Sequence, residues 1–208
     1  MPEIEGVRYQ TVFFDFDGVI ADTNTLKKRN IHASVAKHLA PQPAAEFVSF
    51  FTANNGVPRE KKVYSRFDAQ TGRQILQDYA RRNRESFERI STTPGFELFF
   101  QNCQQDGART WVLSGGDAGE IRAILRRNGL DQFDGILAGP DTKSEHLRRL
   151  EYPEPALFIG DSRHDHEVAK EFGLGFIFMS GYTQFAEWKE YFRKNKIDKI
   201  ISNLGDLL

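Results

Sequence analysis

Short apolar runs alternate along the chain with longer segments of helical spacing. Each run ends in Gly, Asp or Ser, and the five clearest are residues 11–16, 110–113, 135–137, 156–159 and 175–179. Continuous apolar runs of this length are typical of parallel strands that are buried on both faces and joined by crossover helices. The pattern therefore predicts an α/β fold with a doubly wound, Rossmann-like parallel sheet. Residues 199–202 are predicted to add one more short strand at an edge.

Several helices begin with a capping signal, a Ser, Thr or Asp followed three residues later by an acid. The pairs are Asp117 with Glu120, Thr142 with Glu145, and Ser162 with Asp165. Such pairs satisfy the free amides of a first helical turn. They place polar side chains where strands end and helices begin, the edge at which open sheets bind ligands and helix amides attract anions.

Residues 23–91 break the alternation of strands and helices. They show helical spacing, as in Ile31, Val35 and Leu39, and turn signals divide them into roughly four helices. This segment is predicted to be an inserted helical domain, with residues 1–22 and 92–208 forming the sheet domain. Within it, residues 57–90 hold nine Lys and Arg against five Asp and Glu, which favours anionic substrates or a solvated basic face.

Composition excludes several classes of protein. The 28 basic and 29 acidic residues of the 208 give a net charge of -1, which argues against nucleic-acid binding. The single cysteine, Cys103, permits no internal disulfide and no multi-cysteine zinc site. The chain starts without an apolar leader, and no stretch approaches the ~18 apolar residues of a membrane span, so we expect a cytoplasmic protein without a membrane partner.

Acidic side chains follow two of the predicted strands. Asp15 and Asp17 come after the first strand, next to Gly18, and Asp161 and Asp165 come after the strand at 156–159. Buried acids are costly unless they are paired, hydrogen-bonded or bound to a metal. Because oxygen ligands alone suit a hard cation, the four acids predict a magnesium site and not a zinc site.

Two further features lie at the same predicted edge of the sheet. Ser114 and Gly115 follow the second long strand and offer a hydroxyl and flexible amides. Lys143 opens a helix, a place where a cation meets the positive end of the helix dipole unless an anion lies nearby. Taken with the acids, they predict a site that gathers carboxylates, a hydroxyl and a lysine.

In this order the motifs resemble those of the haloacid dehalogenase superfamily of phosphohydrolases. The matching residues are Asp15-Phe16-Asp17-Gly18, Ser114, Lys143 and Gly160-Asp161-Ser162 with Asp165. The resemblance covers the sheet domain, and the inserted helices resemble that superfamily's helical cap. It implies that Asp15 is the nucleophile that forms an aspartyl-phosphate and that Asp17 is the general acid and base.

The same resemblance assigns the cofactor and the phosphate contacts. Magnesium would be held by Asp15, Asp161, the backbone carbonyl of Asp17 and, directly or through water, Asp165. Ser114, Gly115 and Lys143 would bind the phosphoryl oxygens, whose charge must be neutralised in the transition state. His164 stands where related phosphatases often have Asn, so the geometry around the metal is one point that the sequence leaves open.

The resemblance implies a magnesium-dependent phosphatase that hydrolyses a small phosphorylated metabolite, such as a sugar phosphate. Dehalogenating and phosphonate-cleaving members lack an aspartate at the position of Asp17, so Asp17 indicates phosphate ester hydrolysis. Substrate specificity is expected from the cap, where Asn54, Asn55 and Arg59 form a polar turn. A phosphosugar mutase of the same superfamily remains an alternative, as does a phospho-accepting receiver domain, although a receiver would have no cap. The oligomeric state is left open.

Overall fold

The computed structural model describes residues 2–4 and 6–208, and its centre is a six-stranded parallel sheet. The strands are β3 (Thr11–Phe14), β4 (Arg109–Asp117), β5 (Gly135–Gly139), β6 (Ala156–Gly160), β7 (Gly175–Met179) and β8 (Ile200–Ile201). Their order across the sheet is β5-β4-β3-β6-β7-β8, and every neighbouring pair is parallel. The predicted α/β fold is confirmed. A small antiparallel ribbon, β1 (Glu3–Ile4) with β2 (Val7–Arg8), precedes the sheet.

Both faces of the sheet are buried because side chains alternate along each strand. In β3, Val12 and Phe14 pack on the face covered by α5 (Phe96–Gln105) and α6 (Ala118–Arg127). Phe13 packs on the opposite face, with α7 (Lys143–Leu147) and α8 (Arg163–Glu171). The chain continues through α9 (Trp188–Asn195) to the turn η2 (Leu204–Leu207). The central strand therefore lies between two helical layers, as a doubly wound sheet requires.

Strand β4 differs most from its prediction, since it extends to Asp117 and not only to residue 113. Its pairing with β5 is regular up to Leu113 and resumes at Asp117, with an irregularity between them. Ser114, Gly115 and Gly116 occupy this irregular stretch. An interrupted ladder bends a strand and re-aims its side chains, which places these residues at the strand end where a ligand could lie.

Residues 23–91 form a separate helical lobe, called the cap below. It consists of α1 (Asn24–Val35), α2 (Pro41–Ala53), α3 (Arg59–Tyr64), α4 (Ala69–Ser86) and the short turn η1 (Phe87–Arg89). Most of its apolar side chains form their own cluster, which includes Ile31, Phe47 and Tyr79, whereas Phe87 packs in the core of the sheet domain. Among the described residues, no helix of the cap or of the sheet domain has the length and apolarity needed to cross a membrane.

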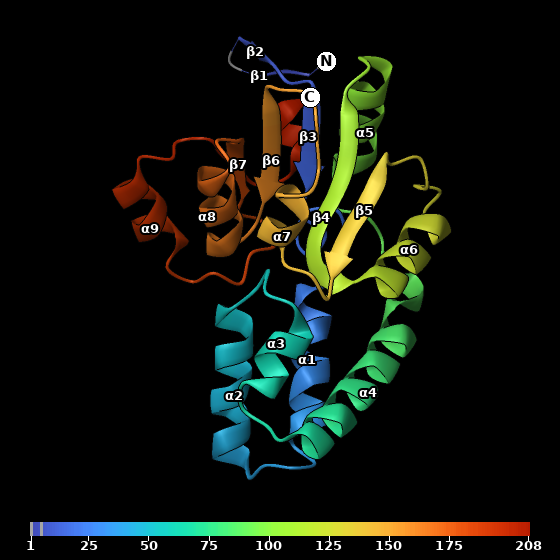
Figure 1. Cartoon of the computed structure of the whole chain (residues 1–208), viewed down its shortest axis with the longest axis vertical. Coiled ribbons are helices and arrows are strands. Elements are labelled where there is room, and N and C mark those ends of the chain that lie inside the picture. The colour runs from blue at the N-terminus through green and yellow to red at the C-terminus, as the bar shows by residue number, and fades with distance from the viewer. Residues whose placement is uncertain (1, 5) are drawn as a thin grey trace.

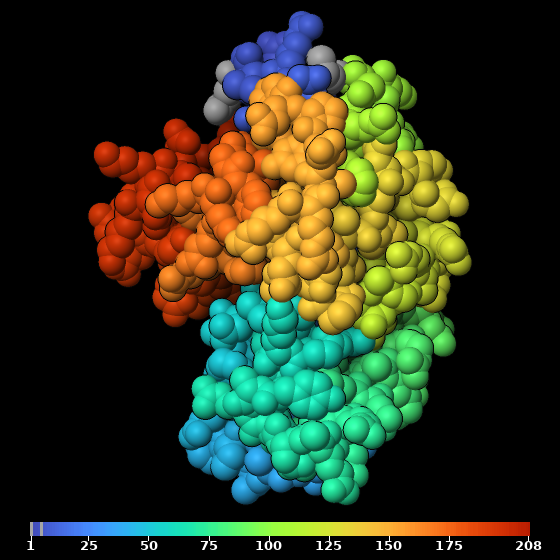
Figure 2. Space-filling model, viewed as in Figure 1, coloured from blue at the N-terminus to red at the C-terminus, as the bar shows by residue number. Residues whose placement is uncertain are grey.

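Two connecting segments that lie side by side join the cap to the sheet domain. Ala21 at the entry bridges Thr92 at the exit, and the amide of Thr93 donates to the carbonyl of Ile20 at 2.9 Å. Gly18 makes the sharp turn after β3 with a φ of +79°. Figures 1 and 2 show that the cap lies against the carboxyl ends of the central strands. The cap therefore covers the edge of the sheet to which the sequence assigns the chemistry.

Candidate active site

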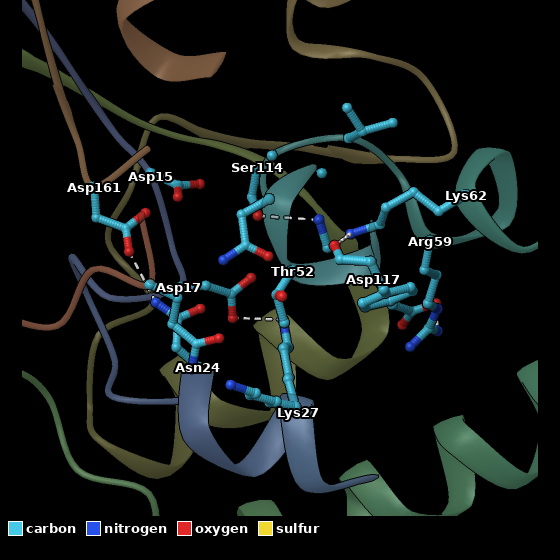
Figure 3. A pocket seen from close by; sticks show the side chains of 18 of the residues that line it. Asp15, Asp17, Asn24, Lys27, Thr52, Arg59, Lys62, Ser114, Asp117 and Asp161 are labelled. Carbon is cyan, nitrogen blue, oxygen red and sulfur yellow. Dashed lines mark hydrogen bonds and ion pairs between the residues drawn. The ribbon is translucent and has the colours of Figure 1, made fainter. Parts of the chain in front are cut away.

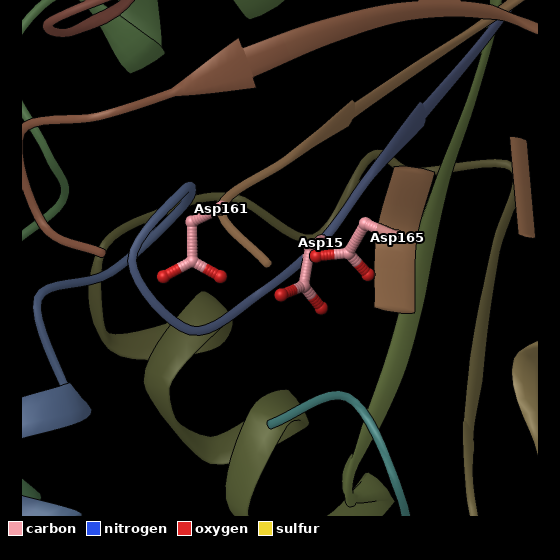
Figure 4. Close-up of side chains that lie close together, drawn as sticks. All are labelled: Asp15, Asp161 and Asp165. Atoms are coloured by element: carbon pink, nitrogen blue, oxygen red, sulfur yellow. The ribbon is translucent and has the colours of Figure 1, made fainter. Parts of the chain in front are cut away.

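Three carboxylates meet at the carboxyl end of the sheet. Asp15 follows β3, Asp161 follows β6, and Asp165 lies in the first turn of α8. One oxygen from each lies within 4.8 Å of the others, and all three residues are buried. Figure 4 shows their carboxylates facing a common space. Crossover connections bring these residues together because parallel strands end at the same edge of a sheet.

The gathered carboxylates resist ionisation. Burial raises the pKa of Asp15 to about 7, and repulsion by Asp165 and Asp17 adds to this, while Lys143 opposes it. Burial also raises the pKa of Asp161 well above its ordinary value, again helped by its acidic neighbours. Desolvation and like charge disfavour the ionised form of both groups. A cation bound beside these carboxylates would favour their ionised form.

Lys143 is the cation that lies inside the cluster. Its ammonium donates to Asp15 Oδ1 at 2.7 Å and to Asp165 Oδ1, and it has no solvent exposure. Burial alone would lower the pKa of this lysine, but Asp15 and Asp165 outweigh burial and raise it. At its helix start, Thr142 and Glu145 form a capping box, while Asp15 and Asp165 supply the negative charge that compensates the lysine. The structure directs Lys143 to the carboxylates and does not place it in the wall of the open pocket.

Asp17 points away from the three-carboxylate cluster and toward the cap. One of its oxygens accepts hydrogen bonds from Thr23 and from the ammonium of Lys27, the latter on α1. Burial would raise the pKa of Asp17, but Lys27 and Thr23 lower it on balance. Among the described residues, its side chain is therefore not part of the group of carboxylates that could hold a metal ion.

Ser114 and Gly115 lie beside Asp15 in the wall of the pocket. The Ser114 hydroxyl accepts from the amide of Gly116 at 3.0 Å, so its own proton remains available to a ligand oxygen. A methyl group on Gly115 would lie 2.3 Å from the carbonyl oxygen of Gly56, in the cap. Only glycine therefore allows the cap to approach this turn so closely.

A pocket of roughly 610 Å³, its open mouth included, separates the sheet edge from the cap. Figure 3 shows side chains from both domains directed toward it. The sheet domain contributes Asp15, Asp17, Ser114, Gly115, Gly116, Asp117, Asp161 and Gln184. The cap contributes Asn24, Lys27, Lys28, Phe51, Thr52, Asn55, Gly56, Val57, Arg59, Lys62 and Tyr79. The arrangement can hold a phosphoryl group against the acids while the rest of the substrate faces the cap.

The three cap residues singled out in the sequence have different positions. Asn55 lines the pocket, whereas the side chain of Asn54 donates to the Phe50 carbonyl at 2.8 Å and closes the end of α2. Arg59 lines the pocket but is bound to Glu120 at 2.7 Å and to Asp117 at 3.0 Å. Asn54 is therefore a helix-end residue, and Arg59 connects the cap to α6 of the sheet domain.

Sequence reasoning missed Asn24, Lys27 and Lys62. The Asn24 amide donates to Asp161 Oδ2 at 2.8 Å and so connects the first cap helix to the carboxylate cluster. Its position directly after the acidic turn, at a helix start, was the one available signal. The sequence around Lys27 and Lys62 gave no such signal, because tertiary packing decides which face of a helix meets the sheet domain.

His164 has no place among the clustered ligands. Its ring packs under the cap, where a methyl group on Gly56 would lie 2.8 Å from Cδ2. Its buried Nε2 has no hydrogen-bond partner among the described residues. Burial lowers the pKa of His164, and the nearby Lys143 adds to this. The residue therefore packs against the cap loop, and in the part of the chain that the structure describes, the clustered groups that could hold a metal ion are all aspartates.

Comparison with known proteins agrees with this geometry. The haloacid dehalogenase-like hydrolase family matches residues 9–173, most of the chain. The chain therefore belongs to this family and is a hydrolase of the phosphatase type, as the motifs predict. None of the comparisons favours a mutase or a receiver domain.

The relatives match this chain over nearly its whole length and nearly their own, but at low sequence identity. A protein of Caldanaerobacter subterraneus subsp. tengcongensis, provisionally named a pyrophosphatase PpaX, is 24% identical over 97% of this chain and 94% of its own. The pyrophosphatase PpaX of Bacillus mycoides is 21% identical over 97% and 96%. A Bacteroides fragilis structure, provisionally described as a haloacid dehalogenase-like hydrolase, matches with a TM-score of 0.77 at 22% identity, covering 97% and 100%. Such structural likeness shows the shared fold.

Proposed function

We propose that this protein is a magnesium-dependent phosphatase that hydrolyses a small phosphorylated metabolite through an aspartyl-phosphate on Asp15. The observation that supports this most strongly is the group formed by Asp15, Asp161, Asp165 and Lys143 at the sheet edge, next to the pocket beneath the cap. Residues 23–91 would act as the cap domain of this enzyme. They would close over the substrate and exclude water from the reacting groups.

The residues present suit a magnesium ion. Three buried carboxylates supply oxygen ligands only. Burial, and after it repulsion between neighbouring acids, raises the pKa of both Asp15 and Asp161, and a bound cation would offset both effects. Asp15, Asp161 and the Asp17 carbonyl would hold the ion, with Asp165 acting directly or through water. When bound, the ion supplies charge neutralisation to the phosphoryl oxygens.

The residues of the chain then divide the reaction into two steps. In the first, a carboxylate oxygen of Asp15 attacks phosphorus, the bond to the leaving oxygen breaks, and Asp17 donates a proton to that oxygen. In the second, Asp17 takes a proton from water, whose oxygen attacks phosphorus and releases phosphate and free Asp15. Lys27 and Thr23 lower the pKa of Asp17 in the observed arrangement, which favours the ionised form that the first step leaves and the second step uses.

The phosphoryl oxygens would be bound by Ser114 and the amide of Gly115. Lys143 would act mainly by holding Asp15 and Asp165 in place, since its ammonium is enclosed between them. Asn55, the residue of the polar cap turn that lines the pocket, would contact the leaving group. Arg59 would contact the substrate while its guanidinium stays paired with Glu120 and Asp117.

The test is phosphate release with and without magnesium, using wild type and Asp15→Asn on an aryl phosphate, phosphoglycolate, pyrophosphate and sugar phosphates. The variant keeps the shape of the side chain but removes the attacking oxygen, so turnover should fall by at least about 10³-fold. Asp22→Asn, at an exposed acid on the same connecting segment, is the matched control and should leave turnover unchanged. Full activity in Asp15→Asn, or activity unaffected by chelation of magnesium, would overturn the proposal.

A further inference from the structure

The charges that line the pocket are segregated between its two walls. Its carboxylates, Asp15, Asp17, Asp117 and Asp161, all belong to the sheet domain. Its cations, Lys27, Lys28, Arg59 and Lys62, all belong to cap helices α1 and α3. A phosphoryl group bound at the acids would therefore have its leaving group directed toward a basic wall.

Two of the inward cations already have protein partners. Lys27 is paired with Asp17, and its ammonium also lies 5.9 Å from the centre of the Phe87 ring. Arg59 is bound by Glu120 and Asp117, so its charge is balanced before any ligand arrives. Neither of these side chains needs a substrate anion to be stable in the closed cap.

Lys62 is different because it is buried without an acidic partner. The residue is 6% exposed, and its ammonium contacts the Phe51 carbonyl at 3.3 Å and the Phe51 ring at 3.8 Å. Among the described residues, no carboxylate oxygen lies within 4.0 Å of it, since it takes part in none of the ion pairs. Figure 3 shows its side chain extending from α3 into the pocket.

Such a group is expensive to keep charged. A buried ammonium loses its hydration, and one carbonyl oxygen satisfies only one of its three donors. Burial lowers the pKa of Lys62 to about 7, and repulsion by Lys27 adds to this. The ring and the carbonyl of Phe51 stabilise the ammonium only in part. A methionine would fill the same space without the free-energy cost of burying a charge. Because Lys62 also lines the pocket, its remaining donors are available to a group bound there.

Resting on the proposed phosphatase function, we propose that Lys62 binds a second anionic group, carried by the leaving group of the substrate. The substrate class is then a phosphate ester or anhydride whose leaving group bears its own phosphoryl or carboxylate group. That anion would complete the hydrogen bonding of the ammonium in a partly desolvated pocket, where charge-assisted bonds are strong. A substrate with a neutral leaving group would leave the lysine unpaired and would bind less well.

The experiment compares substrates that differ only in the second charge. Phosphoglycolate and 2-hydroxyethyl phosphate have leaving groups of similar size, one with a carboxylate and one with a neutral hydroxyl. Pyrophosphate supplies the phosphoryl version, and an aryl phosphate reports the basal activity of the carboxylate cluster. The ratio of kcat/KM for each charged substrate to that for its neutral counterpart is measured in wild type, Lys62→Met and Lys61→Met.

Lys61 is the matched control because it is the neighbouring lysine on α3, with a side chain 49% exposed and facing Glu145. We expect Lys62→Met to lower kcat/KM for phosphoglycolate, pyrophosphate or both by about tenfold to a hundredfold, the scale of a hydrogen bond to a charged group. Cleavage of aryl phosphate and 2-hydroxyethyl phosphate, which carry no second anion, should fall much less or not at all. Lys62→Arg should retain much of the preference, and the charged substrate that loses most identifies the anion as carboxylate or phosphoryl.

Equal loss on charged and neutral substrates in a folded Lys62→Met protein would overturn the inference, as would a wild type with no preference for the second charge. If circular dichroism shows that Lys62→Met is unfolded, the comparison of wild type with Lys62→Gln and Lys62→Arg decides the matter by the same ratio. Failure of wild type to release phosphate from any of these compounds would instead refute the proposed function, on which the inference depends.

Discussion

At the scale of single residues, Lys143 shows how a buried charge depends on its neighbours. It is enclosed between Asp15 and Asp165, and the ring of Phe158 lies 5.2 Å from its ammonium. A buried cation between two acids contributes mainly by preventing an uncompensated charge, since breaking such a pair costs more than forming it gains. Lys143 therefore favours the ionised form of Asp15, against the effect of burial, and orients its carboxylate.

Substituting Lys143→Met should test this role. We expect turnover to fall by at least about 10²-fold and the free energy of unfolding to fall by about 3 kcal/mol near neutral pH, because buried carboxylates lose their cation. Urea unfolding and phosphate release measure the two effects. Lys170→Met, at an exposed lysine of α8, serves as the control. Unchanged stability in Lys143→Met would contradict the assigned role.

At the scale of elements, helix α4 shows how the cap is held together locally. Asp78 lies on this helix, and its side chain is only 14% exposed. The groups that donate to it are Arg82, Arg81, Lys37 and Ser34. Burial would raise the pKa of Asp78, but these hydrogen bonds outweigh burial and lower it well below 3.8. The cluster joins α4 to α1.

This predicts a pH-dependent contribution to stability. Because the folded pKa of Asp78 is below its unfolded value of 3.8, its contribution is complete above that value and is lost as the pH falls toward the folded pKa. Asp78→Asn should therefore lower the free energy of unfolding by about 1 kcal/mol at pH 7, and the difference from wild type should shrink below pH 4. Thermal unfolding at pH 7 and pH 3 measures it. Glu85→Gln, at an exposed partner of Arg81, should have little effect at either pH. A pH-independent difference would refute the account.

At the scale of the whole molecule, the closed position of the cap depends on a few contacts with the sheet domain. Glu120 of α6 accepts from Arg59 at 2.7 Å and from Asn83 at 3.2 Å, so one acid binds two cap helices. Gly115 and Gly56 allow the two backbones to meet closely beside it. Opening the cap would break these contacts while leaving intact the apolar cluster inside the cap.

Glu120→Gln should therefore favour the open cap without unfolding the protein. We expect kcat/KM to fall by about threefold to tenfold, the effect of losing about 1 kcal/mol of ion-pair energy at a partly covered site. Hydrogen exchange of the amides near Gly56 and Gly115 should become faster. Glu190→Gln, at an exposed acid of α9, should change neither measurement. Wild-type exchange in Glu120→Gln would show that other contacts hold the cap.

The same contacts explain the limits of sequence reasoning. Strands and helix starts were predictable because apolar runs and capping pairs are local patterns. The extension of β4 beyond residue 113 was not, since the irregular Ser114 to Gly116 stretch depends on its pairing with β5. Arg59 was predicted as a substrate contact, but its partners Asp117 and Glu120 lie far along the chain.

The sequence by itself determined the fold class and the order of the acid, hydroxyl and lysine motifs, because parallel strands end at one edge whatever their order in the sheet. Only the tertiary structure decided which cations face the pocket. Lys61 and Lys62 are adjacent and chemically alike, but successive residues on a helix point about 100° apart. Packing of α3 against α4 leaves one lysine on the surface and buries the other in the pocket. The physical reason is that a helix's rotation about its axis is set by the surfaces it packs against, which lie elsewhere in the chain.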